Sequence, residues 1–206
     1  MKQINKYLSN KIKNSLFIKA TDETIKQIVK DELDRLGHDA DLNHIDVSEV
    51  TNMNNLFYCG NGNGILSDKY EDLNPDISKW NTANVTQMKY MFGYCKDFDC
   101  DISGWNVGNC KYFVGTFEQC KKFNSDLSQW DTHNAKRLFG TFYYCEVFNS
   151  NISQWDVSNV IDMDNLFEGC EKFNQNLSQW DVSKVISHEH MFRECPIKEE
   201  FKPKFK

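Results

Sequence analysis

The side chains of this sequence with the greatest chemical potential are a histidine pair and eight cysteines. His188 and His190 stand close to Cys195, and imidazole nitrogens with a thiolate are ligands that zinc accepts. However, His188 occupies a repeat position that we expect in the core and His190 one that we expect at the surface, so the two rings should diverge. Metal-dependent activity at these three residues is therefore an alternative interpretation, and the main prediction contains no metal and no cofactor.

Five of the eight cysteines recur every 25 residues, which is a pattern of packing rather than of chemistry. They are Cys95, Cys120, Cys145, Cys170 and Cys195. No Cys-x-x-Cys pair occurs. Cysteines on helices in adjacent layers would lie about 8–10 Å apart, beyond the roughly 7 Å limit for a disulfide. We therefore expect buried thiols that pack as small hydrophobic groups, while the state of Cys59, Cys100 and Cys110 stays open.

The remaining polar motifs do not form a catalytic set. The segment from Gly60 to Gly64 is rich in glycine, but the lysine and the serine or threonine of a phosphate-binding loop do not follow it directly. Aspartates and asparagines recur at fixed places, as at Asp101 and Asn109, and favour turn and capping roles because their side chains satisfy free backbone amides. Without a nucleophile, a base and an orienting group together, we predict a protein that is not an enzyme.

Tryptophan, cysteine, phenylalanine and serine all follow one 25-residue period along the sequence. The tryptophans are Trp80, Trp105, Trp130, Trp155 and Trp180. An earlier copy is degenerate, with Ile45 in the tryptophan position and Phe57 in the phenylalanine position. Six repeats therefore span residues 41–195, and an insertion at about 58–70 separates the first from the second.

Each repeat divides into two halves with different hydrophobic patterns. The half around the tryptophan, such as residues 177–182, alternates apolar and polar residues and predicts a short strand. The second half spaces apolar residues by three, as at Val160, Met163 and Leu166, and predicts a short helix. Because one repeat cannot bury its apolar side alone, we expect an α/β repeat fold. It would be a right-handed leucine-rich-repeat-like solenoid with short parallel strands and short helices, capped by an N-terminal helical segment.

The repeat pattern resembles a known family. Residues 173–183, Phe-Asn-Gln-Asn-Leu-Ser-Gln-Trp-Asp-Val-Ser, and the motif Asn-Val-x-x-Met-x-x-Met-Phe-x-x-Cys at 84–95 are similar to the BspA-like leucine-rich repeat, also called the mycoplasma-type lipoprotein-associated repeat. The resemblance implies a curved solenoid that binds other molecules, often at cell surfaces. Because the sequence shows no export signal or lipid anchor, we expect a cytoplasmic protein.

The two ends of the sequence should close the stack of repeats. Residues 1–40 are expected to form an N-terminal helical cap, with an amphipathic helix over 22–36 that follows Thr21 and a shorter helix around Tyr7. Residues 196–206 contain two prolines and two phenylalanines, and we expect them to lie as a C-terminal strap over the last repeat.

The composition and the differences between repeats narrow the range of possible functions. A net charge of −6 excludes a generally basic nucleic-acid-binding coat, and no apolar run is long enough to cross a bilayer. Specificity should lie in residues that vary between copies, and repeats two to four carry an aromatic and basic patch in their second halves. The predicted partner-binding residues are Tyr90, Tyr94, Tyr112, Val114, Phe139, Tyr143, Tyr144, Lys111, Lys136 and Arg137.

This patch leads us to predict a non-catalytic, macromolecule-binding solenoid that acts as a protein-binding adaptor or inhibitor. The partner would be a protein or a ribonucleoprotein, such as a host defence complex, and not a membrane. Binding of RNA or single-stranded nucleic acid is the alternative, because aromatic rings stack on bases and lysines neutralise phosphates. The net charge of −6 makes it the less favoured one.

Overall fold

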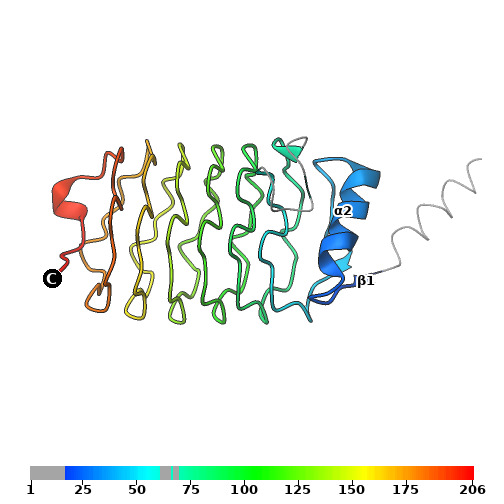
Figure 1. Cartoon of the computed structure of the whole chain (residues 1–206), viewed down its shortest axis with the longest axis horizontal. Helices are drawn as coiled ribbons and strands as arrows, with labels where there is room; N and C mark the ends of the chain where they lie inside the picture. Colours follow the sequence, from blue (N-terminus) through cyan, green and yellow to red (C-terminus); the bar gives the residue numbers. More distant parts are fainter. Residues whose placement is uncertain (1–16, 61–65, 67–69) are drawn as a thin grey trace, which may run out of the picture.

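The computed structural model describes residues 17–60, 66 and 70–206. Successive repeats lie side by side along the longest dimension of the molecule, each as one coil of the chain, and the sequence colours run in order from one end to the other (Figure 1). Helix α2 (Ile25–Leu36) lies at the first end and the 3-10 helix η2 (Glu199–Phe201) at the other. The molecule is therefore an elongated stack of coils.

A short parallel sheet closes the first end. Strand β1 (Ile18–Lys19) pairs with β2 (Ile45–Asp46), and the first residues of the two strands lie opposite each other. Beyond β1, the Asp22 carboxylate accepts hydrogen bonds from the backbone N–H (2.7 Å) and the hydroxyl (2.6 Å) of Thr51. The segment before α2 is thereby tied to the first coil.

Helix α2 lies within the range that the sequence predicts for an amphipathic helix. It begins at Ile25 rather than at residue 22, because Thr24 and not Thr21 takes the N-cap position. Ile25, Val29 and Leu33 are buried at four-residue intervals, which place them on one face of the helix. These side chains belong to the same hydrophobic core as the coils.

The second half of each repeat forms consecutive turns, so the short helices that its apolar spacing predicts are wrong. Within the described residues, α2 is the one α-helix. Two positions in each of the five coils that contain a tryptophan have a left-handed backbone with φ between 51° and 72°, which an α-helix does not contain. The first position holds Tyr90, Gly115, Gly140, Asn165 and His190, and Asn55 in the first coil; the second position holds Tyr94, Gln119, Tyr144, Gly169 and Glu194.

A parallel hydrogen-bond ladder joins these turns to the next coil. Isolated parallel bridges link Gln87 to Tyr112 and Tyr112 to Arg137, each 25 residues further on. Further along the same two coils, the N–H of Tyr90 donates to the carbonyl of Val114 at 2.8 Å. Most of the parallel pairing therefore lies in the half that was expected to be helical, and equivalent residues of neighbouring coils are about 4.7–4.9 Å apart.

The tryptophan half consists of two turns in place of the predicted strand. In a representative coil, the Asp101 carboxylate accepts a hydrogen bond from the Ser103 N–H at 3.0 Å, which confirms the turn role expected for the recurring aspartates. The indole N–H of Trp105 donates to the Ile77 carbonyl of the preceding coil at 3.2 Å. Its ring stacks on that of Trp80 with 6.4 Å between centroids.

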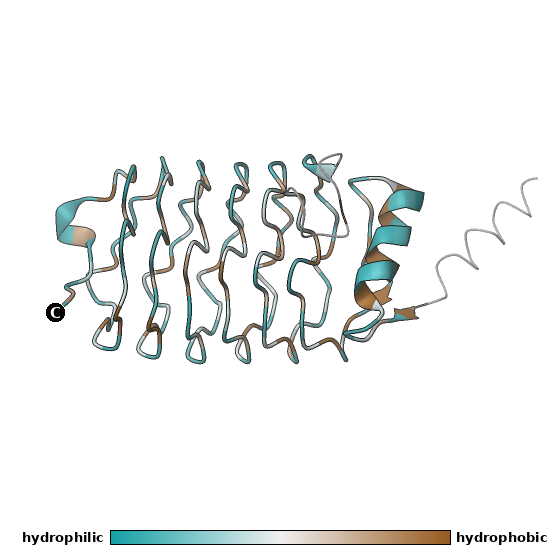
Figure 2. Ribbon diagram, viewed as in Figure 1, coloured by the Kyte–Doolittle hydropathy of each residue, from teal (hydrophilic) through white to brown (hydrophobic). Residues whose placement is uncertain are grey.

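The hydrophobic core runs without a break along the stack. Phe117 lies between Phe92 and Phe142, with ring centroids 5.6 and 5.7 Å away, and all three rings are fully buried. Hydrophobic and hydrophilic residues alternate around each coil (Figure 2). Stacked aromatic pairs of this kind add about 0.5–1.5 kcal/mol each beyond the area that they bury. The right-handed winding and the relation to leucine-rich repeats stay predictions.

Residues 196–206 pack against the last coil. The N–H of Leu177 donates to the carbonyl of Phe201 at 2.8 Å, and the Phe205 ring stacks on His188 at 3.9 Å between centroids. The short helix expected around Tyr7 lies outside the described residues, as does most of the insertion expected at about 58–70. The domain boundaries at 40 and 195 stay predictions.

Candidate functional site

The predicted partner-binding residues lie on one face of three consecutive coils. We call it the ladder face; it comprises residues 86–94, 111–119 and 136–144. The N–H of Tyr90 donates to the Val114 carbonyl at 2.8 Å, and at the edge of the face the N–H of Lys136 donates to the Lys111 carbonyl at 2.9 Å. Residues that the sequence separates by about 25 positions are thereby neighbours in space.

The aromatic members of the predicted patch are half-buried. Tyr90 lies over Gly115 of the next coil, where a Cβ atom would stand 2.3 Å from the ring carbon Cε1. Tyr144 lies over Gly169 in the same way, with 2.6 Å between such a Cβ and its ring carbon Cδ1. These two rings therefore fill space above glycines of the neighbouring coil, in addition to any contact with a partner.

We define Lys111, Lys136 and Arg137 as the basic edge of the ladder face. Within the described part of the chain, the ion pairs include none of these three side chains. Lys89 adds a fourth cation, because its Nζ lies 4.8 Å from the centre of the Tyr112 ring. Three other lysines of these repeats are paired with acids: Lys96 with Glu71, Lys121 with Glu146 (2.6 Å) and Lys122 with Asp97 (2.9 Å).

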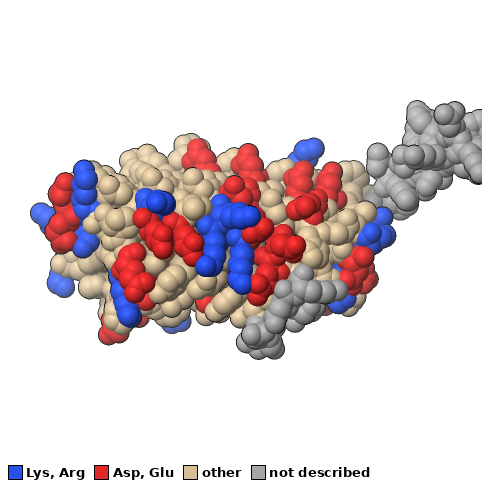
Figure 3. Space-filling model, turned by 90° about the horizontal axis from the view of Figure 1, so that it is seen from above, with Lys and Arg blue, Asp and Glu red and all other residues tan. Residues whose placement is uncertain are grey.

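Both signs of charge are interleaved over the side of the molecule shown in Figure 3, with basic groups gathered near its middle and acidic groups around them. A long-range field of a single sign therefore does not dominate this side. Charges that have no local partner, as at the basic edge, are the ones free to bind another molecule.

Tyr58 of the preceding coil lies next to the ladder face, although the 25-residue period does not predict it. Its ring lies edge-on to the rings of Tyr90 and Tyr94, with 6.2 and 5.7 Å between centroids. The insertion lengthens the first repeat, so that Phe57 and Phe92 are equivalent positions 35 residues apart. The alignment of these two phenylalanines could have revealed Tyr58 from the sequence, because Tyr58 directly follows Phe57.

Glu118 is a residue of the ladder face whose role the sequence does not reveal. It is half-buried, and its Oε2 lies 3.1 Å from where a Cβ of Gly115 would stand. The Tyr94 side chain lies near this carboxylate. Burial raises the pKa of Glu118, and burial together with the nearby carboxylate raises the pKa of Tyr94 to about 12. The ion pairs of the described residues do not include Glu118.

Most of the chain matches one known protein family. The family model described as "Mycoplasma protein of unknown function, DUF285" matches residues 25–146 and 114–202. The chain belongs to this family. The match supports the mycoplasma-type repeat that the sequence resembles, but not its relation to leucine-rich repeats. No curated protein and no solved structure matches the chain. In the described ranges, no helix has the length and apolar character needed to cross a membrane.

The cysteines of the repeats form a column inside the stack. The thiols of Cys120 and Cys145 donate to the carbonyls of Phe92 (3.0 Å) and Phe117 (2.9 Å) in the preceding coil. Burial raises the pKa of both thiols far above the usual value, so they stay neutral. All eight cysteines are free, and only Cys195 of the column is half-buried rather than buried. The packing role expected for this column is confirmed.

The expected spacing of about 8–10 Å between cysteines of adjacent layers is wrong. The layers are hydrogen-bonded coils rather than packed helices, and such coils lie closer together. The Sγ atoms of Cys59 and Cys95 are 3.3 Å apart and both residues are fully buried. Cys110 is buried in the core, and the sulfur of Cys100 accepts a hydrogen bond from the Ile77 N–H at 3.5 Å. The three cysteines outside the repeat column therefore also have packing or hydrogen-bonding roles.

The residues of the alternative metal site do not converge. The ring of His188 stacks on Phe205, so this histidine lies at the exposed end of the stack and not in the core as expected. His190 is exposed, and the Cys195 thiol donates to the Phe173 carbonyl at 3.5 Å. Among the residues that the structure describes, no three His, Cys, Asp or Glu side chains stand close enough to hold a metal ion.

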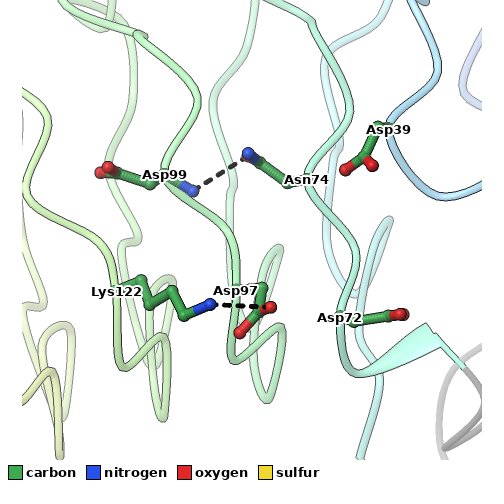
Figure 4. A pocket seen from close by; sticks show the side chains of 6 residues that line it. All are labelled: Asp39, Asp72, Asn74, Asp97, Asp99 and Lys122. Carbon is green, nitrogen blue, oxygen red and sulfur yellow. Dashed lines mark hydrogen bonds and ion pairs between the residues drawn. The ribbon is translucent and has the colours of Figure 1, made fainter.

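An open hollow of about 380 Å³ lies near the first end of the stack. Its lining residues are Asp39, Asp72, Asn74, Asp97, Asp99 and Lys122 (Figure 4). Lys122 forms an ion pair with Asp97, and the N–H of Asp99 donates to the Asn74 side-chain oxygen at 3.0 Å. These contacts link one coil to the next, so the hollow is explained by the stacking of coils and adds no candidate site.

Proposed function

We propose that this protein is a non-catalytic binding module, an adaptor or an inhibitor, that holds a protein partner on the ladder face of its second to fourth repeats. The basic edge carries the proposal: Lys111, Lys136 and Arg137 have no ion pair among the described residues and lie beside half-buried rings. Arginine and tyrosine next to one another are the residues most enriched in the energetic centres of protein interfaces.

Acidic groups on or beside the ladder face favour a protein partner over a nucleic acid. Glu118 lies on the third repeat, and Asp162 of the fifth repeat lies next to Arg137 in the parallel ladder. Carboxylates repel phosphate groups, whereas a protein surface can present acids to the basic edge and basic groups to the acids. The mixed charge of this face therefore supports a protein as the partner.

Charge reversal at the basic edge tests the proposal. Affinity purification from the native cell identifies the partner, and calorimetry with purified components measures the dissociation constant Kd. Lys136→Glu combined with Arg137→Glu is expected to raise Kd by at least about 100-fold, because it sets like charges against the acids of the partner. The melting temperature of the variant, followed by circular dichroism, is expected to stay close to that of the unmodified protein.

The matched control reverses two exposed lysines outside the ladder face. Lys79→Glu combined with Lys172→Glu changes the net charge by the same amount and is expected to change Kd by less than about threefold. Equal effects of the two double variants would contradict the location of the site. A purified partner that proves to be nucleic acid, with an affinity that falls steeply as salt is added, would contradict the protein-binding proposal.

A further inference from the structure

Glu118 is a carboxylate that the described part of the chain surrounds with tyrosines and leaves without a cation. Over Gly115, a Cβ atom would stand 2.3 Å from Tyr90 Cε1 and 3.1 Å from Glu118 Oε2, so the ring and the carboxylate lie above the same glycine. Tyr94 also lies near the carboxylate, and Tyr58 lies edge-on to both other tyrosines. A negative charge and several rings therefore meet at one point of the surface.

An equivalent carboxylate elsewhere in this protein shows which kind of group can pair with Glu118. Positions 118, 143, 168 and 193 are 25 residues apart, and their backbones are joined coil to coil, as where Gly169 N–H donates to the Arg193 carbonyl at 2.9 Å. In this column, the Glu168 side chain is ion-paired with Arg193 of the next coil, with 3.6 Å between Oε1 and Nη1. The equivalent neighbour of Glu118 is Tyr143. The column thus supplies a guanidinium to one carboxylate and none to the other.

We propose that Tyr58, Tyr90, Tyr94 and Glu118, which we call the tyrosine site, bind the guanidinium of an arginine side chain on the partner protein. The inference rests on the proposed protein-binding function, since Tyr90 and Tyr94 belong to the predicted patch. A guanidinium is planar, stacks on aromatic rings and donates two parallel hydrogen bonds to a carboxylate. It is also more weakly hydrated than a lysine ammonium, which suits a half-buried carboxylate.

The tyrosine site and the basic edge together give the ladder face two regions of opposite charge. A partner that places an acid against Lys136 and Arg137 and an arginine against Glu118 fits in one orientation. The reversed orientation sets like charges against each other at both regions, which strongly disfavours it. The arginine therefore selects the orientation of the partner as well as adding affinity.

Two small probes test the site without the partner. N-acetyl-arginine amide carries the guanidinium, and N-acetyl-citrulline amide has nearly the same shape without the charge. Each is titrated into the full chain with ¹³C-labelled tyrosine rings, and NMR follows the ring signals of Tyr90 and Tyr94. The arginine probe is expected to shift these signals to saturation in the millimolar range, and the citrulline probe is expected to leave them in place.

Three variants sharpen the test. Glu118→Gln is expected to weaken the arginine probe by at least about tenfold, because a charge-assisted pair is lost. Its control, Glu171→Gln, removes the same charge from an exposed acid and is expected to change the affinity by less than about twofold. Tyr143→Arg copies the arrangement of Glu168 and Arg193, so it is expected to fill the site from within and abolish probe binding.

The inference is overturned if the two probes shift the ring signals equally, or if the arginine probe binds unchanged to the Glu118→Gln or the Tyr143→Arg variant. Its failure is distinguishable from a failure of the proposed function. If the protein does not bind the arginine probe but loses its partner on charge reversal at the basic edge, the proposed function stands and only the tyrosine site is rejected. If the protein binds the probe but still binds its partner after that reversal, the role of the basic edge is rejected and the tyrosine site stands.

Discussion

Glu118 links the charge state of a single residue to the stability of the protein. Burial raises its pKa above the usual 4.5, so the folded chain holds this proton more tightly than the unfolded chain does. The ionised carboxylate therefore destabilises the fold above the folded-state pKa, and this contribution vanishes as the pH falls below the unfolded-state value. Glu118→Gln is expected to raise the melting temperature at pH 7 and to leave it nearly unchanged at pH 4.

Thermal melts by circular dichroism across this pH range measure the effect. The exposed Glu171→Gln variant serves as the control and is expected to shift the melting temperature little at either pH. A Glu118→Gln variant that melts lower than the unmodified protein at pH 7 would contradict the destabilising effect of the buried charge.

Burial also predicts the order in which the cysteines react. Cys100 and Cys195 are half-buried, whereas the other six are buried with thiols held inside the stack. Only thiolates attack an aromatic disulfide reagent, so an inaccessible thiol with a raised pKa reacts slowly. In the native protein at pH 7.5, the two half-buried thiols are expected to react first, and all eight in denaturant. Rapid reaction of all eight without denaturant would contradict the closed core.

At the scale of the element, left-handed turns take the place of the expected helices. A spacing of three between apolar residues is common to a helix and to consecutive turns, so it did not distinguish them. The position that holds Tyr90 also holds glycine in two coils and asparagine in two others, and these residue types favour a left-handed backbone. These glycines and asparagines at one repeat position could have indicated turns rather than helices. The second left-handed position holds glycine in one coil only, so its conformation was not predictable from residue types.

A pair of glycine substitutions tests the turns. Gly115 has a φ of 57°, and a Cβ there would meet the Tyr90 ring at 2.3 Å. Gly115→Ala is therefore expected to lower the free energy of unfolding by about 1–3 kcal/mol. Gly104 is exposed and a Cβ there would have nothing within 4 Å, so Gly104→Ala is expected to change it by less than about 0.5 kcal/mol. Urea titration measures both, and equal effects would contradict the turn geometry.

At the scale of the whole molecule, the 25-residue period made the location of the patch predictable. Any fold that stacks such repeats brings position n beside position n + 25, so the tyrosines and cations of repeats two to four became neighbours even though their local structure was predicted wrongly. The position of Tyr58 beside Tyr90 depends on how the first repeat aligns with the second across the insertion. The role of Glu118 depends on how deeply its carboxylate is buried among aromatic rings, and the repeat pattern of the sequence does not predict that burial.

Binding of a partner protein to the ladder face can be tested by photo-crosslinking. The most direct test places a photo-reactive benzoyl-phenylalanine in the full chain, either at Phe139, which is half-buried in this face, or at Gln129, which is exposed in the tryptophan half. After irradiation in the native cell, denaturing gels measure covalent adducts. We expect an adduct with one partner protein from position 139 and none from position 129. Equal adducts from both positions, or an adduct from position 129 alone, would contradict binding at the ladder face.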